Sequence, residues 1–144
     1  MKREQEVIDQ IRSFNRFYTD IIGLLDQHFL DSPFSLTEGR VLYEIRHTED
    51  CSAKKIKEKI GIDEGYLSRI LDIFRKKGLI TKAPSSEDRR LHIIKLTEKG
   101  RKEFASLNDH SDRLISRIIE KLSEEEREEL VSMTERIRHL LSRD

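Results

Sequence analysis

The sequence predicts a mainly helical α+β fold: a winged helix-turn-helix with N-terminal and C-terminal dimerisation helices. Three observations predict it. Apolar residues recur at steps of three and four near both ends of the chain, as in amphipathic helices. Two short capped helical segments separated by a glycine lie in the middle. A β-rich pair of segments around a charged hairpin follows them, so one domain accounts for all 144 residues.

A long amphipathic helix is predicted near the N-terminus, over about residues 4–29. Its apolar residues share one helical face because of their spacing. They are Ile8, Ile11, Phe14, Tyr18, Ile21, Ile22, Leu25 and Phe29. The helix is expected to stop at Asp31-Ser32-Pro33, since such residues break helices. Ser35 and Glu38 then have the spacing of a capping box, which opens a second helix over about 35–47.

Two further helices on either side of Gly61 form the predicted helix-turn-helix. Ser52 is placed to cap the third helix, and Gly61 to end it. Asp63 is placed to cap the fourth helix, which ends before Gly78. The apolar residues of this fourth helix keep helical spacing and predict its buried face: Leu67, Ile70, Leu71 and Phe74.

A small hairpin and two more helices complete the predicted fold. Residues 79–82 and 91–96 are read as two strands joined by a charged turn, the wing. Thr97 is placed to cap a fifth helix, and Ser123 begins a capping box for a sixth. We therefore expect a single domain over residues 1–144, with the winged helix-turn-helix over about 35–97 and dimerisation helices over about 4–29 and 98–142.

The zero net charge conceals a basic middle segment. Residues 51–90 carry 11 Lys and Arg against 6 Asp and Glu, whereas residues 1–50 carry 6 against 10 and residues 101–144 carry 9 against 11. A neutral chain of this kind argues against nonspecific polyanion binding, but its basic segment can face phosphates. A helix matches the width of the DNA major groove, and a basic hairpin can follow the adjacent backbone.

The candidate DNA-binding residues lie on the third and fourth helices and in the wing. They are Ser52, Lys54, Gly65, Tyr66, Ser68, Arg69, Ile73, Lys76 and Arg89. Most of those on the fourth helix lie opposite its apolar stripe or on the shoulders of that face. Arg69 is the best placed for a bidentate contact to guanine or a phosphate clamp. The alternative is a solvated helix face, which such polar residues usually form.

Several short motifs occur together in the order of one helix, a winged helix-turn-helix and two helices. They are Leu36-Thr37-Glu38 through Leu42, Ile60-Gly61-Ile62-Asp63, Leu67-Ser68-Arg69, Lys77-Gly78-Leu79-Ile80, and Asp88-Arg89-Arg90 followed by Lys95-Leu96-Thr97-Glu98-Lys99-Gly100. With these motifs almost the whole chain resembles the multiple-antibiotic-resistance regulator (MarR) family of winged-helix transcription factors. The resemblance implies a homodimeric, sequence-specific regulator of transcription, a repressor relieved by a small-molecule effector, bound to an inverted-repeat operator in double-stranded DNA.

The resemblance also implies two finer features. An ion pair from Asp63 to Arg90 would tie the wing to the fourth helix and leave Arg89 for DNA. A small aromatic effector would bind a cavity between the dimerisation helices and the winged domain. Its lining would be Phe14, Phe17, Tyr18, Tyr43 and Phe104. Aromatic residues at helical spacing more often mean ordinary core packing, so both interpretations of these five residues stay open.

One segment resembles a subgroup in which this domain precedes an acetyltransferase domain. The residues concerned are Phe14-Asn15-Arg16-Phe17-Tyr18-Thr19 and Leu30-Asp31-Ser32-Pro33-Phe34-Ser35. The sequence ends at Asp144, and the expectation for this chain is the DNA-binding part without the enzyme part.

Other functions find less support in the sequence. No nucleophile elbow, glycine-rich phosphate loop or paired-carboxylate motif is present, so we expect no enzyme and no cofactor. His47 and Cys51 straddle a predicted helix break, which argues against a metal site, and Cys51 is expected to be a structural thiol. No membrane span or signal peptide is apparent, so a cytoplasmic location is expected. The alternative function is a helical interaction module whose basic middle segment binds an acidic partner.

Overall fold

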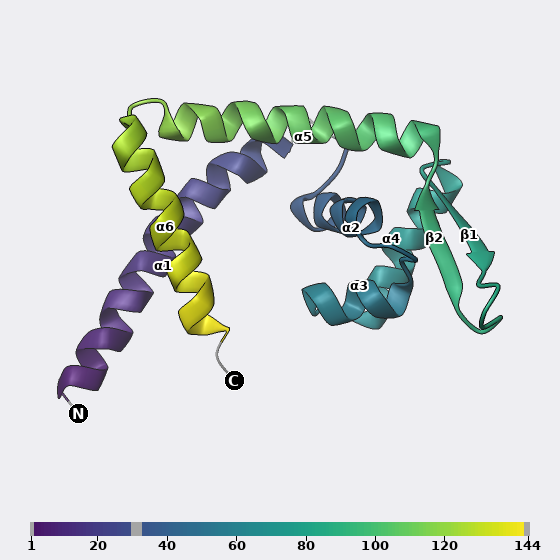
Figure 1. The fold of residues 1–144 in the computed structure, drawn as a ribbon, viewed down its shortest axis with the longest axis horizontal. Helices are drawn as coiled ribbons and strands as arrows, with labels where there is room; N and C mark the ends of the chain where they lie inside the picture. The colour runs from purple at the N-terminus through teal and green to yellow at the C-terminus, as the bar shows by residue number, and fades with distance from the viewer. Residues whose placement is uncertain (1, 30–32, 143–144) are drawn as a thin grey trace. The chain divides into compact units, whose positions relative to one another are not determined.

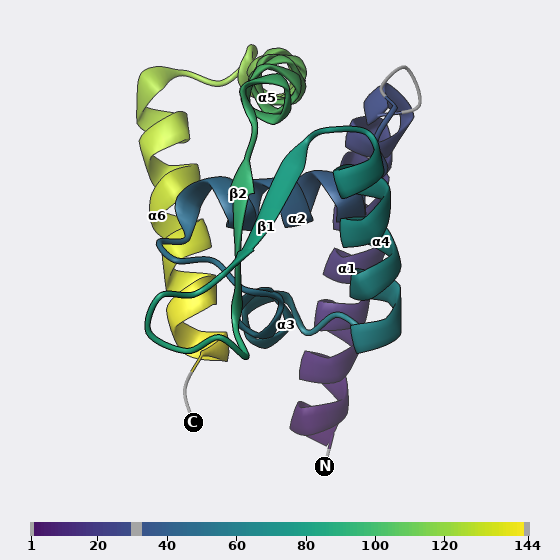
Figure 2. The same cartoon turned by 90° about the vertical axis from the view of Figure 1, so that its right-hand side faces the viewer.

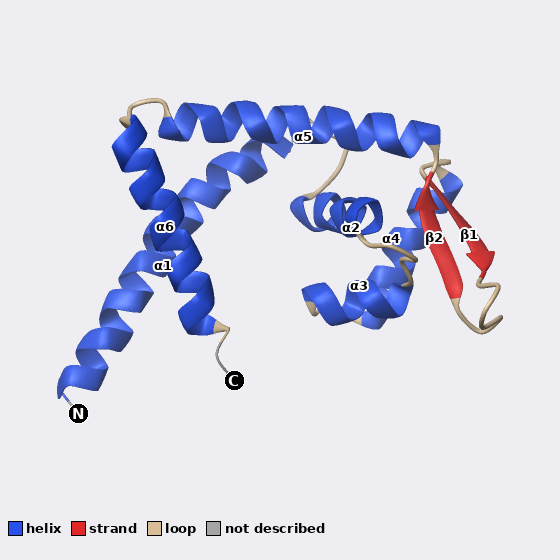
Figure 3. Cartoon of the chain, in the orientation of Figure 1, coloured by secondary structure: helices blue, strands red, loops and turns tan. Residues whose placement is uncertain are grey.

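The structure is a computed structural model that describes residues 2–29 and 33–142. Its elements are α1 (Lys2–Phe29), α2 (Leu36–His47), α3 (Ala53–Ile60), α4 (Glu64–Lys76), β1 (Ile80–Pro84), β2 (His92–Leu96), α5 (Glu98–Ile119) and α6 (Glu124–Leu141) (Figures 1 and 3). The order and kind of these elements confirm the predicted fold class. The predicted side-chain roles of Ile22, Leu25 and Phe29, and the helix stop at Asp31-Ser32, lie outside the described residues.

The helix starts are those that the capping residues predict. The Ser35 hydroxyl accepts from the amide of Glu38 at 3.2 Å, and the Glu38 carboxylate accepts from the amide of Ser35 at 3.0 Å. Ser123 forms the same reciprocal pair with Glu126 at the start of α6. Each cap satisfies amides that a helix leaves without intrahelical partners, which is why the local sequence suffices to place these starts.

The core lies between α2, α3, α4, the two-stranded sheet and the first half of α5 (Figure 2). The predicted stripe of α4 is buried throughout, with Phe74 fully inaccessible to solvent. Sixteen buried apolar residues form one cluster. They are Phe34, Val41, Leu42, Ile45, Cys51, Ile56, Leu67, Ile70, Leu71, Phe74, Leu79, Ile80, Ile94, Leu96, Phe104 and Leu107. This cluster holds the exposed face of α4 in a fixed position relative to the sheet.

The wing is an antiparallel pair whose register runs from Ile80 opposite Leu96 to Pro84 opposite His92. The amide of Ile94 also donates to the carbonyl of Cys51 at 2.8 Å, which fastens β2 to the chain just before α3. At the other end of the sheet, the Thr97 hydroxyl donates to the carbonyl of Gly78 at 2.6 Å. The wing is therefore attached to the helix-turn-helix at the middle of β2 and at its C-terminal end.

The junction between α4, β1 and α5 depends on two glycines. Gly78 has a φ of +74°, and it closes α4 with bonds from its own amide to Arg75 and from the amide of Leu79 to Phe74. Gly100, in the first turn of α5, packs against the backbone of Leu79 so closely that an added Cβ would overlap the Leu79 carbonyl oxygen. The start of α5 is thereby held directly against the start of β1.

The chain divides into two compact units, residues 1–110 and residues 111–144. Within the first unit, every side chain from residue 3 to residue 20 is exposed. Within the second, no residue of α6 is buried. Over the described residues, no helix has the length and apolar content needed to cross a membrane. The single-domain organisation over residues 1–144 stays a prediction.

Candidate nucleic-acid interface

The exposed face of α4 presents most of the residues predicted to read DNA. Gly65, Ser68 and Arg69 are exposed, as are Tyr66 at 39% and Ile73 at 43%. The opposite face is buried in the core, so this helix cannot rotate without exposing its apolar stripe. The N-terminal half of α4 is therefore a polar surface with a fixed orientation.

Arg69 has its guanidinium over a neighbouring aromatic ring instead of against a carboxylate. Its Cζ atom lies 5.9 Å from the centroid of the Tyr66 ring. In the part of the chain that the structure describes, no carboxylate forms an ion pair with Arg69. Its N–H donors are consequently free for an external acceptor, and the ring limits the positions that the guanidinium samples.

Lys76 differs from Arg69 because its charge is already paired. Its Nζ lies 3.0 Å from the Asp72 carboxylate, and Arg75 lies 3.1 Å from the same group. The hydrogen bond from Lys76 and its positive charge hold the pKa of Asp72 below the ordinary value of 3.8, and Arg75 adds to this effect. The predicted DNA contact from Lys76 therefore belongs to a cluster with one net positive charge, at the C-terminal end of the exposed face.

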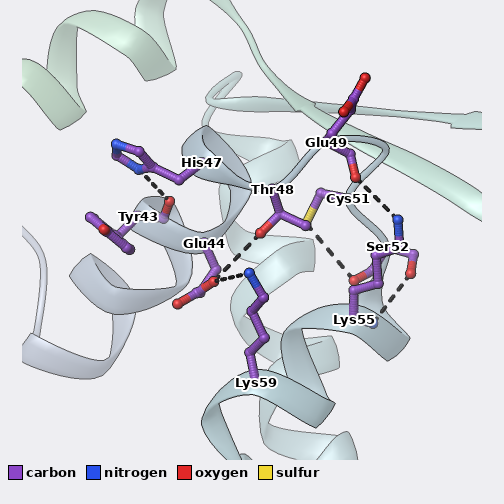
Figure 4. A network of polar contacts seen from close by, with 9 residues as sticks. All are labelled: Tyr43, Glu44, His47, Thr48, Glu49, Cys51, Ser52, Lys55 and Lys59. Atoms are coloured by element: carbon purple, nitrogen blue, oxygen red, sulfur yellow. Dashed lines mark hydrogen bonds and ion pairs between the residues drawn. The ribbon is translucent and has the colours of Figure 1, made fainter.

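The lysines of α3 are also unequal. Lys55 donates to the carbonyl of Glu49 at 3.1 Å, Lys57 pairs with Glu64 at 3.3 Å, and Lys59 pairs with the Glu44 carboxylate at 3.7 Å. Figure 4 shows the contact of Lys55 with Glu49 and that of Lys59 with Glu44. Lys54, the lysine predicted to contact DNA, is exposed and has no ion pair with another described residue. Of the four, Lys54 is the one with neither a side-chain hydrogen bond nor an ion pair to another described residue.

Two predicted residues have structural roles in the fold. Ser52 is 6% exposed, and its hydroxyl accepts from the amide of Lys55 at 3.3 Å as the cap of α3. The Asp63 carboxylate accepts from the amide of Tyr66 at 2.9 Å as the cap of α4. Asp63 forms no ion pair with Arg90 among the described residues, so the ion pair that the resemblance implies between the wing and the fourth helix is not seen there. The Asp63 carboxylate accepts the hydrogen bond from the α4 amide instead.

The tip of the wing is an ordered turn that exposes two arginines. The Ser85 hydroxyl accepts from the amides of Glu87 and Asp88 at 3.2 and 3.5 Å, and the Asp88 carboxylate accepts from the amide of Arg90 at 3.0 Å. Arg89 and Arg90 are both exposed. These short-range bonds are those of serine and aspartate turns, and they fix the backbone that carries both guanidinium groups.

A groove of about 610 Å³ runs between α3, α4 and β1. Its lining residues are Ala53, Lys54, Lys57, Glu64, Gly65, Leu67, Ser68, Leu71 and Lys82. It thus brings together three predicted residues, Lys54, Gly65 and Ser68. It also adds Lys57 and Lys82, which were not predicted. The strand pattern of residues 79–82 could have indicated Lys82, because it shares a strand face with Ile80.

The predicted effector residues form two separate groups. Phe14 stacks on Tyr18 within α1, with ring centroids 5.7 Å apart. Tyr43 lies 6.3 Å from Phe104, which is 8% exposed and belongs to the core. Phe17 is exposed on α1. Among the described residues no ring contact joins the α1 group to the other, and the aromatic effector pocket stays a prediction.

Cys51 lies in the core and has no sign of activation. Its side chain is 1% exposed, and burial raises the pKa of its thiol above 9.0, an effect that Lys55 partly offsets (Figure 4). In the described ranges, no group of three His, Cys, Asp or Glu side chains is placed to hold a metal ion. The main chemical feature of the surface formed by α3, α4 and the wing is thus positive charge beside the exposed face of α4.

Comparisons with known proteins agree with this geometry. The family model described as "MarR family" matches residues 34–92. YdgJ of Bacillus subtilis (strain 168), an uncharacterized HTH-type transcriptional regulator, is 24% identical over 138 residues, which cover 94% of this chain and 79% of that protein.

Two similar solved structures contain DNA. The transcriptional repressor CouR, bound to a 23-mer DNA duplex, has a TM-score of 0.75 at 24% identity and covers 88% of this chain and 89% of its own. A mutant MarR from E. coli, complexed with operator DNA, has a TM-score of 0.75 at 22% identity, with coverage of 92% and 95%. The chain is thus similar to MarR-family transcription regulators over residues 34–92, and it shares the winged-helix fold of these structures.

Proposed function

We propose that the chain is a homodimeric, sequence-specific DNA-binding repressor that a small aromatic effector releases from an inverted-repeat operator in the cytoplasm. The observation that carries the proposal is the exposed N-terminal half of α4, with an unpaired Arg69 held over Tyr66. An α-helix fits the major groove, where an arginine can donate two hydrogen bonds to a guanine. The DNA-bound structures of similar fold support this use of the surface.

The wing supplies the second part of the proposed interface. Arg89 and Arg90 extend from an ordered turn at the end of a hairpin that is fastened to the same core as α4. A cationic hairpin beside a helix in the major groove lies near the backbone or the adjacent minor groove. In this arrangement α4 supplies base contacts, and the wing supplies affinity that does not depend on sequence.

The homodimer is supported by apolar side chains that the isolated chain leaves in water. On α1 they include Ile11 at 52% and Phe17 at 62%, and on α6 Val131 at 56% and Leu141 at 80%. Extended apolar faces of this kind mark interfaces between chains. A two-fold pairing would set two copies of α4 about 34 to 36 Å apart, one turn of DNA, which calls for an inverted-repeat site.

The effector part of the proposal rests on the exposed aromatic rings of Phe14, Tyr18 and Tyr43. A small aromatic ligand could stack on such rings as they stack on one another. To release DNA, the ligand must bind one separation of the two DNA-reading helices more tightly than the other, since equal affinity shifts no population.

Selection of bound duplexes from random-sequence DNA tests the proposed function most directly. We expect the purified protein to enrich an inverted repeat, which a gel shift then confirms against a scrambled duplex of equal length. A panel of small aromatic compounds added to the preformed complex tests the effector, with release of DNA as the expected result. Failure to enrich any sequence, together with binding of an acidic protein partner, would support the interaction-module alternative instead.

A further inference from the structure

Lys82 points from the wing toward the DNA-reading helix. In a strand, alternate side chains point to opposite faces, so Lys82 shares a face with Ile80, which is 2% exposed and packed in the core. Thr81, Ala83 and their β2 neighbour Lys95 line a different depression, of about 470 Å³, while Lys82 lines the groove along α4. The two exposed lysines of the hairpin, Lys82 and Lys95, thus lie on opposite sides of the sheet.

The groove that Lys82 enters has a lysine from each side. Lys54 comes from the first turn of α3, Lys82 comes from β1, and Gly65 and Ser68 of α4 line the same groove. Lys57 also lines the groove, but its ammonium pairs with Glu64 at 3.3 Å. The groove therefore has a net positive charge, because it holds three lysines and one glutamate. Lys57 is paired with Glu64, so this net charge comes from Lys54 and Lys82.

We propose that Lys54 and Lys82 each bind a backbone phosphate of duplex DNA, along the flank of α4 that carries Gly65 and Ser68. This inference rests on the proposed function, and it adds Lys82 to the predicted DNA-binding residues and assigns Lys54 a phosphate. A helix lying in the major groove is bordered by backbone phosphates, so cations in a groove along its flank meet the adjacent backbone. Ammonium groups on long flexible stems suit such contacts, which position the helix without reading sequence.

The groove favours a backbone phosphate over a small free anion. The amides at the start of α4, which could otherwise attract an anion, are occupied by the Asp63 carboxylate, and Glu64 adds a second negative charge there. A free phosphate would have to approach both carboxylates. A backbone phosphate is instead brought to the lysines by the docking of α4, without displacing the cap.

The salt dependence of DNA binding tests the proposal. Lys54→Ala, Lys82→Ala and Lys82→Arg are compared with wild type, using a duplex recovered by the selection and the intact protein. Each lost phosphate contact lowers the slope of log affinity against log salt by about 0.9, so each alanine variant should lose about 1.8 in a dimer, while Lys82→Arg keeps the slope. Lys95→Ala is the matched control, since Lys95 is an exposed lysine on the other side of the same hairpin.

We expect Lys95→Ala to leave the slope unchanged and all variants to share the wild-type urea midpoint. A wild-type slope for Lys82→Ala, or an equal decrease for Lys95→Ala, would overturn the phosphate contact while the proposed function stands. The absence of any duplex binding by wild-type protein would overturn both. Inorganic phosphate at constant ionic strength provides a further comparison. Competition with DNA that disappears in Lys82→Ala would identify a free-anion site and refute the backbone assignment.

Discussion

Among single residues, Arg69 combines exposure on the outer face of α4 with the absence of a charged partner among the described residues. Arg69→Ala should lower operator affinity by about 1 to 3 kcal/mol and relax the preference at one base position, as loss of a bidentate base contact does. The fold should persist, because Arg69 lies opposite the buried stripe. Competition gel shifts with single-base operator variants measure the effect. Unchanged affinity and preference would exclude Arg69 from base recognition.

Asp72 neutralises positive charge on the same helix, so removing its charge should strengthen binding. Asp72→Asn frees Lys76 and Arg75 and is expected to raise affinity for a nonspecific duplex several-fold and to steepen its salt dependence. Fluorescence anisotropy at several salt concentrations measures both quantities. The control is Glu98→Gln, which breaks a similar helical pair with Lys102 on α5. An equal gain in DNA affinity for Glu98→Gln would mean that the effect comes from the net charge of the protein and not from the position of Asp72 on α4.

Because the pKa of Asp72 is lowered, its contribution to the stability of the fold depends on pH in a definite direction. The carboxylate is more acidic in the folded chain than in the unfolded one, so its pairing favours folding above the ordinary pKa of 3.8. That contribution is lost as the pH falls through the lower folded pKa. Because the Asp72 side chain is partly exposed, solvent screens the pair, and the effect on unfolding should be confined to strongly acidic solution.

The local sequence indicated which residues are candidates for binding DNA. It did not indicate which of their side chains are already engaged by other residues of the chain. Arg69 follows from helical periodicity alone. The engagement of Lys55, Lys57 and Lys59 depends on partners up to fifteen positions away, which a helical pattern does not reveal. Asp63 had two possible partners, the helix amide and the wing, and the nearer one holds it.

For the elements, the sequence carried nearly all the information that set their limits. Ser52, Asp63, Thr97 and the capping boxes start helices where predicted, because a cap needs only residues within three positions. The predicted strand at residues 79–82 instead covers Ile80–Pro84, since pairing with β2 extends it through a proline at the strand end. Long-range packing, which local patterns do not encode, accounts for such differences.

The α4, β1 and α5 junction provides a stability test at this scale. Gly100→Ala should destabilise the fold by about 1 to 3 kcal/mol, because the new Cβ would overlap the Leu79 carbonyl and force the backbone to shift. Gly23→Ala on α1 is the control, since its Cβ would meet nothing within 4 Å. Alanine there should stabilise the helix or leave it unchanged. Urea unfolding followed by circular dichroism measures both. A wild-type midpoint for Gly100→Ala would refute the close packing.

At the scale of the whole molecule, the apolar faces of the terminal helices require a cover. Replacing Ile137 and Leu141 with Asp should place charges in the proposed dimer interface, yielding monomers or unfolded chain and abolishing tight DNA binding. The control places the same charges on the opposite face of α6, through Ser132→Asp and His139→Asp. Analytical ultracentrifugation measures the mass. A wild-type monomer at micromolar concentration that still binds one half-site tightly would contradict the dimer.

The exposed wing tip should allow limited proteolysis to distinguish free protein from DNA-bound protein. Arg89 and Arg90 are exposed in a loop, where trypsin acts most readily, whereas helical backbone resists it. If the wing lies against DNA, a bound operator shields this peptide bond. Limited digestion should therefore cut the free protein first at the wing and the complex much more slowly there, while cleavage in the exposed helices continues at its usual rate. The turn of Ser85 and Asp88 thereby gives each molecule a protease-sensitive marker of whether it is on DNA.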